Sequence, residues 1–307
     1  MTTTERESAH DEREAPMNQP ENAIVVGVSS GDNEAVLAFA AEEALRTRCP
    51  LHLVHVLQLP ASEAYAAVYD NAIAVANRTL DEAMSRVRAL AGPDVALTCE
   101  LVDDGWVVAD LVHRGDVGRL MILEHRQESR VRRVFTGSVV TGVAARAQVP
   151  VVSVPEGWSA TTDRPALVTA AVQDPQGASL ILQTAFEEAQ RRGAPLVVLH
   201  AWWIASGYDV VVVDQTFREQ WSARFHEEIT PVMKALREEF PDVEVTVTVR
   251  HAPPVEAVLD AAQTSAILVI GRRHHLLPLR THLGPVARAV LGHSGCPVLV
   301  TPEVPRG

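Results

Sequence analysis

The chain repeats itself at a spacing of about half its length, and this repeat limits the folds that it can adopt. Five short matches recur in the same order. The matches are Glu42-Glu43-Ala44, Pro50-Leu51 and His55, repeated 145 positions later as Glu187-Glu188-Ala189, Pro195-Leu196 and His200, and Gly137 and Pro150-Val151, repeated 147 positions later as Gly284 and Pro297-Val298. Duplication of one domain is the simplest explanation, and 307 residues suffice for two domains of about 150 residues each.

Within each half, short apolar runs typical of strands alternate with segments of helical periodicity. This alternation predicts an α/β fold with a doubly wound parallel sheet and right-handed crossovers. We expect a disordered acidic tail at residues 1–22, a first domain at 23–154, a linker at 155–165 and a second domain at 166–303. The tail is polar, rich in Glu and without apolar period, and the linker is rich in small residues and proline.

The stretch from Ile267 to Val300 carries the clearest functional signal. It predicts a buried strand ended by Gly271, a polar loop, a helix and a second buried strand. The helix has apolar residues at i, i+3, i+4, i+7 and i+8 and is opened by Pro285, whose missing N–H is tolerated in a first turn. Because glycine lets the backbone approach an anion and a helix N-terminus offers unpaired N–H groups, this arrangement is one way to bind phosphate.

This stretch resembles the nucleotide loop of the universal stress protein family, G-x2-G-x9-G-[ST], which is followed by a strand ending in Pro-Val-Leu-Val. Gly271, His274, Gly284 and Pro285 occupy the four motif positions with the family spacing. Two positions have changed, because His274 replaces a glycine and Pro285 replaces the hydroxyl residue. The resemblance covers both halves, so the chain is identified as a tandem member of this family.

The resemblance implies a fold and a cellular role. Each half is then a flavodoxin-like, five-stranded unit of the adenine nucleotide alpha hydrolase-like type, and the last strands of two units usually pair to make a dimer. We expect the two halves to pair in this way within one chain, as an intramolecular pseudo-dimer. The family further implies a cytoplasmic protein of stress adaptation that works through small-ligand binding or protein partners rather than turnover.

The first half departs from the nucleotide-binding pattern of the family. In ATP-binding members an Asp that ends the first strand contacts the nucleotide, and Ser29 occupies that place here. The first-half loop keeps the helix-opening Gly137 and Ser138 but loses both earlier glycines. A Glu124 carboxylate would repel a polyphosphate, and Gln127 carries a side chain where close backbone approach is needed. We therefore expect the more degenerate site in this half.

The second half keeps more of the pattern. Gln173 takes the place of the Asp, and Asp174, one residue later, is a candidate substitute. Gly271 and Gly284 are retained, and guanidinium groups suited to phosphate are added. The added cations are Arg272, Arg273 and Arg280. The alternative is that these arginines solvate an exposed loop. If either half binds ATP or another adenine nucleotide, we expect the second half to do so.

Several other residues favour structural roles. The loop histidines match no metal spacing, and His55 and His200 are predicted to be strand-end histidines fixed by hydrogen bonds rather than catalytic bases. Trp202 and Trp203 lie near the adenine position of nucleotide-binding relatives, but packing is favoured over stacking on a base. Pro231 should kink or interrupt its helix. The remaining features are the loop histidines His274, His275, His282 and His293, and the pairs Glu42-Glu43 and Glu187-Glu188, which we expect to be solvated helix faces.

The composition excludes several function classes. A formal net charge of -12 disfavours nucleic acid or an acidic membrane as a partner, and no apolar run reaches the roughly 18 residues of a membrane span. Three scattered cysteines indicate no disulfide framework. Lys234 is the only lysine and lies in a helical pattern, so there is no Walker loop. The sequence contains no G-x-G-x-x-G, H-E-x-x-H or C-x-x-C motif, and we expect no enzyme, with slow ATP hydrolysis as the open exception.

Three hypotheses follow from the sequence. The first is a non-catalytic binding or regulatory module with degenerate nucleotide sites. The second is a weak ATP-binding protein, with or without slow hydrolysis, that uses Gly271, Arg272 and Gly284 of the second half. The third is a ligand-free scaffold that forms homo-oligomers through its closing strands.

Overall fold

The computed structural model describes residues 19–58, 69–103, 105–125, 139–160, 166–204, 209, 213–272 and 283–302. Most of the expected strands and helices fall within these ranges. The predicted tail at 1–22 lies almost wholly outside them. None of the helices in these ranges is long and apolar enough to cross a membrane.

The first half alternates strands and helices as predicted. Its elements are β1 (Ile24–Gly27), α2 (Glu34–Thr47), β2 (Leu51–Val56), α4 (Tyr69–Ala91), β3 (Leu97–Val102), α5 (Val107–Asp116), β4 (Leu120–His125), α7 (Val139–Ala144) and β5 (Val151–Pro155).

The second half repeats this order with one added 3-10 turn. Its elements are β6 (Val168–Ala171), η2 (Pro175–Gly177), α8 (Ser179–Arg192), β7 (Leu196–Trp202), α10 (Gln215–Glu239), β8 (Val245–His251), α11 (Pro254–Ala262), β9 (Ile267–Gly271), α12 (Pro285–His293) and β10 (Val298–Thr301).

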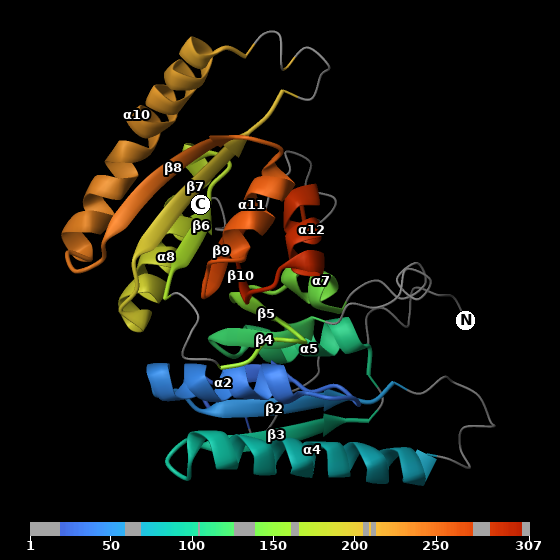
Figure 1. Cartoon of the computed structure of the whole chain (residues 1–307). Coiled ribbons are helices and arrows are strands. Elements are labelled where there is room, and N and C mark those ends of the chain that lie inside the picture. The colour runs from blue at the N-terminus through green and yellow to red at the C-terminus, as the bar shows by residue number, and fades with distance from the viewer. Residues whose placement is uncertain are drawn as a thin grey trace, which may run out of the picture.

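The two five-stranded sheets join into one continuous sheet of ten strands. The strand order is β3-β2-β1-β4-β5-β10-β9-β6-β7-β8, and strand pairing is parallel within each half. The halves meet where β5 and β10 pair antiparallel, with Leu299 opposite Val152 (Figure 1). The predicted fold class and the intramolecular pseudo-dimer are therefore confirmed.

Helices cover both faces of the sheet, and the apolar core is divided between them. One core lies under α2, α4, α8 and α10, and it includes Phe186, Ile229 and Leu182. The other lies under α5, α7, α11 and α12, and it includes Met121 and Leu268. The near-continuous Val, Ile and Leu runs of the central strands follow from this burial on both faces.

The helices α2 and α8 end in the same left-handed conformation. Arg48 follows α2 with φ 55° and ψ 36°, and Gly193 follows α8 with φ 57° and ψ 40°. Glycine adopts this conformation without steric cost, whereas arginine does not. Both halves therefore share the same backbone geometry at this helix end, but only the second half has a glycine there.

Helix α10 runs through Pro231 without interruption, from Gln215 to Glu239. Of the two effects predicted for Pro231, a kink or an interruption, the interruption does not occur. Asp214 caps the first turn by accepting a hydrogen bond from the Phe217 N–H at 2.8 Å. The buried side chains of this helix are Phe225, Ile229, Met233 and Leu236, which lie at helical spacing on both sides of the proline. Their packing on the sheet offsets the lost backbone hydrogen bond.

The prediction that both glutamate pairs form solvated faces is wrong for Glu43 and Glu188, which are 2% and 4% exposed. Glu43 binds Arg46 at 2.7 Å and Arg192, from the other half, at 2.9 Å. Arg192 also pairs with Glu188 on its own helix, and Glu188 binds Arg191. Burial lowers the pKa of Arg192 to about 10, so its guanidinium remains charged at neutral pH and joins α2 to α8.

The segment predicted as a linker is partly packed. Trp158 is 9% exposed and meets Phe39 of α2 edge to face, with ring centroids 5.3 Å apart. Residues 161–165 of this segment lie outside the described ranges. The segment that follows β5 therefore packs against α2 of the first half, at Trp158, before the second half begins.

Candidate functional site

The carboxyl ends of β6 and β9 define the candidate site of the second half. The chain leaves β6 toward α8 on one face of the sheet and leaves β9 toward α12 on the other face. In a doubly wound sheet, ligands bind in the crevice created by this reversal. The equivalent position of the first half lies between β1 and β4.

Gly271 is the last residue of β9 and lies close to α8. A Cβ atom at this position would lie 2.6 Å from the Cδ1 and 2.9 Å from the Cγ1 of Ile181. The absence of a side chain thus lets α8 approach the end of the strand. The close contact with Ile181 explains this glycine without a ligand.

Gly284 is the N-cap residue of α12, and Pro285 is the first residue of that helix. Gly284 is buried and has extended backbone, with φ -60° and ψ 164°. Pro285 supplies no N–H, so the donors left at this helix end are the N–H groups of Gly284, Val286 and Ala287. The strand-end and helix-start glycines of the predicted loop are therefore in place, with fewer donors than the family pattern provides.

Arg272 points its guanidinium at the first half of the chain. Its Nη1 donates to the Ala145 carbonyl at 2.8 Å, and its Nη2 donates to the Ala147 carbonyl at 2.6 Å. These carbonyls follow α7, so Arg272 caps the carboxyl end of that helix, where a positive charge is favourable. The residue predicted to bind phosphate thus ties the two halves together.

Asp174 lies after β6 and caps the 3-10 turn η2. Its Oδ1 accepts a hydrogen bond from the Gln176 N–H at 3.1 Å, and its side chain is exposed. The candidate positions Gly137 and Ser138 of the first half lie outside the described residues. The second-half loop from Arg273 to His282, which carries Arg280 and three histidines, lies outside them as well.

In the first half, the turn after β1 is closed by a buried asparagine. Asn33 Oδ1 accepts hydrogen bonds from the Ser29 N–H at 2.9 Å and from the Ser29 hydroxyl at 3.0 Å. Asn33 Nδ2 donates to the carbonyls of Ser29 and Gly31. The side chain at the family's Asp position is therefore bound within its own turn.

The equivalent histidines His55 and His200 are fixed by backbone carbonyls. His55 Nδ1 lies 2.8 Å from the Val28 carbonyl and His200 Nδ1 lies 3.0 Å from the Val172 carbonyl. The prediction that these strand-end histidines are held by hydrogen bonds is confirmed. Their donors are directed at the ends of the first strands and not at an open space.

His200 is held in one neutral tautomer. The Val172 carbonyl can only accept a hydrogen bond, so Nδ1 carries the proton, and the Trp221 indole N–H lies 3.4 Å from Nε2 and can only donate. The imidazole also stacks on Phe225 with ring centroids 4.1 Å apart. Burial lowers the pKa of His200, in agreement with a neutral ring.

An aromatic cluster, which the sequence did not reveal, surrounds the end of β7. Trp202 is 6% exposed and contacts Trp221 at 4.9 Å and His251 at 4.4 Å between ring centroids. Trp203 is 40% exposed and stacks on His251 at 5.1 Å. His251 Nε2 is held by the buried carboxylate of Asp209 at 3.0 Å. Trp202 thus packs within the protein, as predicted.

A second buried polar group lies between β2, β3 and α5 in the first half. Glu100 accepts a hydrogen bond from Arg114 at 2.6 Å and lies 3.4 Å from His52 Nε2, while Arg114 also reaches Asp110 at 3.2 Å. Burial opposes ionisation of Glu100, yet the hydrogen bonds from His52 and Arg114 hold its pKa below the ordinary value. These groups satisfy one another, which indicates a structural role.

Within the described ranges, no group of three or more His, Cys, Asp or Glu side chains is arranged to hold a metal ion. His293 lies on α12, and its Nδ1 is 2.9 Å from the Ala289 carbonyl of the same helix. The other three loop histidines fall in the undescribed stretch between Arg272 and Leu283.

Comparison with known proteins gives a consistent result for both halves. The model of the universal stress protein family matches residues 22–155 and 168–302. A universal stress protein of Mycolicibacterium smegmatis is 28% identical over 292 residues, which are 91% of this chain and 97% of that protein. A universal stress protein of Mycobacterium tuberculosis is 26% identical over 298 residues, which are 90% of this chain and 94% of that protein.

The fold is also similar to that of a solved tandem structure. The crystal structure of a universal stress protein from Archaeoglobus fulgidus matches with a TM-score of 0.66 at 18% identity. The match covers 93% of the present chain and 100% of the Archaeoglobus chain. At this identity the likeness concerns the arrangement of strands and helices and not the residues at their ends.

Proposed function

Because the chain belongs to the universal stress protein family in its tandem form, we propose that it is a non-catalytic binding or regulatory module of the stress response, acting in the cytoplasm, whose nucleotide sites are degenerate. The degeneration is most complete in the first half. The module works through small ligands or protein partners rather than through turnover.

The position of Arg272 is the observation that carries this proposal. Its two terminal nitrogens donate to the carbonyls of Ala145 and Ala147, so the cation nearest the strand end is committed to the contact between halves. In the first half, the bonds between Ser29 and Asn33 occupy the groups at the place of the family's Asp. Neither half retains the complete set of groups by which relatives of this family hold a nucleotide.

The absence of turnover is supported by the state of the histidines. His55 and His200 each direct Nδ1 at a backbone carbonyl, and the second nitrogen of His200 faces the Trp221 indole N–H. A general base needs a free acceptor within hydrogen-bond reach of the proton that it removes. His200 has no such acceptor in this arrangement.

A weaker ATP-binding function of the second half is the alternative. Gly271 at the end of β9 and Gly284 at the N-cap of α12 favour it, because a glycine lets the backbone approach an anion and a helix N-terminus offers unpaired N–H groups. Such binding would be confined to the second half and would rely on backbone donors and on side chains of the loop.

The test separates these two functions in one preparation. The purified protein is denatured, and the released soluble fraction is analysed for nucleotides by mass spectrometry, alongside calorimetric titration with magnesium-ATP. The proposal predicts no stoichiometric nucleotide and no heat of binding. Near-stoichiometric ATP or AMP would refute it. In that case Gly284→Val should weaken binding and Gly137→Val should not, if the second half holds the ligand.

A further inference from the structure

At the outer edge of the second half, one side of the last strand has no neighbouring strand among the described residues. β8 is the last strand in the sheet order and, in the described structure, pairs only with β7. The Leu196 N–H binds the Glu244 carbonyl at 2.8 Å and the Ala252 N–H binds the Trp202 carbonyl at 3.1 Å. Because a parallel ladder uses alternate residues, the even-numbered residues from 244 to 252 face β7.

The odd-numbered residues of β8 therefore direct their backbone N–H and C=O groups away from the sheet. These residues are Val245, Val247, Val249 and His251. No described residue forms a hydrogen bond with these outward groups. An edge with a row of unpaired donors and acceptors is a template for the addition of a strand.

A groove of about 480 Å³ runs beside this edge. One wall consists of four consecutive residues, Val249 to Ala252, so the groove follows the backbone and not one face of the strand. The other wall is a single face of α10, formed by residues at i, i+3, i+4 and i+7. The helix residues are Gln215, Arg218, Glu219 and Ser222, and Trp202 completes the lining. The groove thus lies between an open strand edge and a helix.

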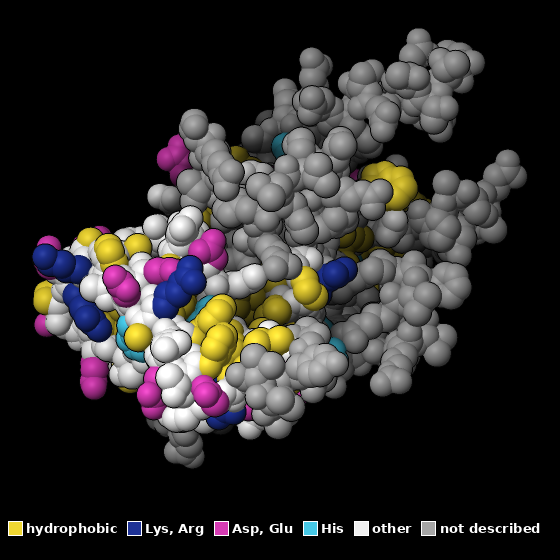
Figure 2. Space-filling view, turned by 90° about the horizontal axis from the view of Figure 1, so that it is seen from above, with side chains coloured by type: hydrophobic (Ala, Val, Ile, Leu, Met, Phe, Trp, Pro, Cys, Tyr) yellow, Lys and Arg dark blue, Asp and Glu magenta, His cyan; other side chains and the backbone are white. Residues whose placement is uncertain are grey.

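The surface around the groove is mixed in charge. The lining itself carries both signs of charge, with Arg218 and Arg250 beside Glu219. Figure 2 shows basic, acidic and hydrophobic side chains close to one another on the described part of the molecule seen from above. Such a surface does not suit nucleic acid, whose binding depends on many phosphate contacts with basic residues. It suits a peptide, which offers backbone groups together with side chains of several kinds.

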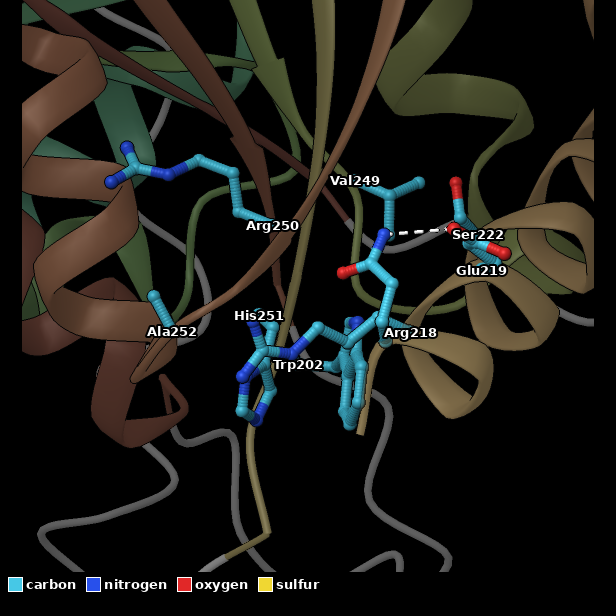
Figure 3. Close-up of a pocket in the computed structure, with 9 residues that line it drawn as sticks. Trp202, Arg218, Glu219, Ser222, Val249, Arg250, His251 and Ala252 are labelled. Carbon is cyan, nitrogen blue, oxygen red and sulfur yellow. Dashed lines mark hydrogen bonds between the residues drawn. The ribbon is translucent and has the colours of Figure 1, made fainter. Parts of the chain in front are cut away.

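One cation in the groove lacks a partner in the described structure. Arg250 binds Asp260 at 3.1 Å on the other face of the sheet, and Glu219 accepts a hydrogen bond from Gln215 at 2.8 Å. No described carboxylate pairs with Arg218. In Figure 3 the Arg218 side chain extends from α10 toward His251, whereas Glu219 lies nearer to Ser222. The His251 end of the groove therefore offers a guanidinium group to an anion.

We propose that this groove binds an extended segment of a partner protein, which adds to β8 as an eleventh strand. The segment pairs its backbone with the outward groups of Val247, Val249 and His251. It packs a β-branched side chain against Val249 and places an acidic side chain against Arg218. The strand edge of this site belongs to β8, at the flank of the half, whereas the candidate nucleotide position lies at the ends of β6 and β9; Trp202, at the end of β7, lies between the two in the strand order.

Amide hydrogen exchange measured by NMR gives the first test. The probe is a fluorescein-labelled, capped heptapeptide, Ser-Val-Thr-Val-Asp-Val-Ser, added to the full chain. Exchange at Val247, Val249 and His251 should slow by about tenfold or more at saturation, because unpaired amides gain partners. Exchange at Thr248 and Arg250, which already bind β7, should not change. Protection without this alternation would overturn the proposed strand addition.

Fluorescence anisotropy with variants tests the groove itself. Ser222→Trp fills the groove from α10 and should abolish binding of the peptide. Gln220→Trp places the same ring on the exposed face of α10, outside the groove, and should leave binding unchanged. Equal binding by both variants would refute the proposal. Sedimentation of the chain alone provides a further check, since self-association lost in Ser222→Trp would assign the edge to a second copy instead.

A charge exchange tests the role of Arg218. Arg218→Glu should raise the dissociation constant of the peptide by about tenfold. A tenfold change corresponds to about 1.4 kcal/mol, close to the contribution of one charge-assisted hydrogen bond. A peptide with Lys in place of its Asp should bind the Arg218→Glu variant more tightly than it binds the original protein. If both proteins prefer the same peptide, the acidic side chain does not meet Arg218 and the proposal fails in this form.

Discussion

Replacing Arg272 with methionine separates a structural role of this residue from a role in nucleotide binding. Arg272→Met keeps an unbranched apolar stem and removes both hydrogen bonds from the guanidinium to the Ala145 and Ala147 carbonyls, which are 2.8 and 2.6 Å long. Hydrogen bonds to a charged group contribute about 1.5–3 kcal/mol each when buried. Arg272 is half-buried, so we expect the free energy of unfolding to fall by about 2 kcal/mol in total.

The assay is urea unfolding without nucleotide, followed by far-UV circular dichroism and by tryptophan fluorescence. The midpoint should fall while the slope with denaturant stays constant, since the change removes contacts without altering the surface exposed on unfolding. Arg288→Met is the matched control, because Arg288 is an exposed arginine of α12 with no ion pair to a described residue. It should leave the midpoint unchanged.

Two results would contradict the structural role of Arg272. One is an unchanged unfolding midpoint in Arg272→Met. The other is a difference in stability between Arg272→Met and the original protein that appears only when magnesium-ATP is added to both. Such a difference would arise if ATP stabilised the original protein by binding its native state through Arg272. Either result would mean that the guanidinium serves the loop and not the end of α7.

Three further changes follow from the packing. Arg48→Gly should raise the free energy of unfolding by about 0.5–1 kcal/mol, and Gly193→Ala should lower it by about 1 kcal/mol, because both positions have left-handed backbone. Urea titrations measure both changes, and changes of the same sign in the two variants would refute this reasoning. Glu43→Gln should cost about 3 kcal/mol in the same assay, whereas Glu42→Gln, at a half-exposed position, should cost less than about 1 kcal/mol. Burial lowers the folded-state pKa of His200, so its contribution is complete above the unfolded value of about 6.5 and is lost as the pH falls through the lower folded value. His200→Gln should therefore show a shallower loss of stability between pH 7 and pH 5, and equal slopes in the two proteins would contradict this.

The sequence was sufficient for the fold because strand and helix patterns are local and the repeat gives each pattern twice. The run from Ile267 to Ile270 is apolar because β9 is buried on both faces, and that burial can be predicted from composition alone. The pairing of β5 with β10 was predicted from the family resemblance and is present with Leu299 opposite Val152.

Side-chain contacts between the halves could not be predicted in this way. The periodicity of α2 places Glu43 on the helix, but the arginine that buries it comes from α8, 149 positions away. The loop position of Arg272 suggested phosphate binding, while its partners lie about as far away in sequence, in the first half. The edge groove was also missed, because β8 becomes an edge only through the order of strands in the whole sheet.

Fusion of the two halves explains why equivalent positions now carry different chemistry. In a symmetric homodimer every interface substitution occurs twice, because the same patch meets itself. In this chain, the position equivalent to Arg192 is Thr47, whose hydroxyl donates to the Glu43 carbonyl at 2.7 Å. One arginine therefore serves both glutamates, and a second buried guanidinium, with its cost of desolvation, is avoided. The same freedom applies to the loops, so the first half could lose both earlier loop glycines while the second half retained Gly271; the helix-opening glycine is present in both halves, as Gly137 and Gly284.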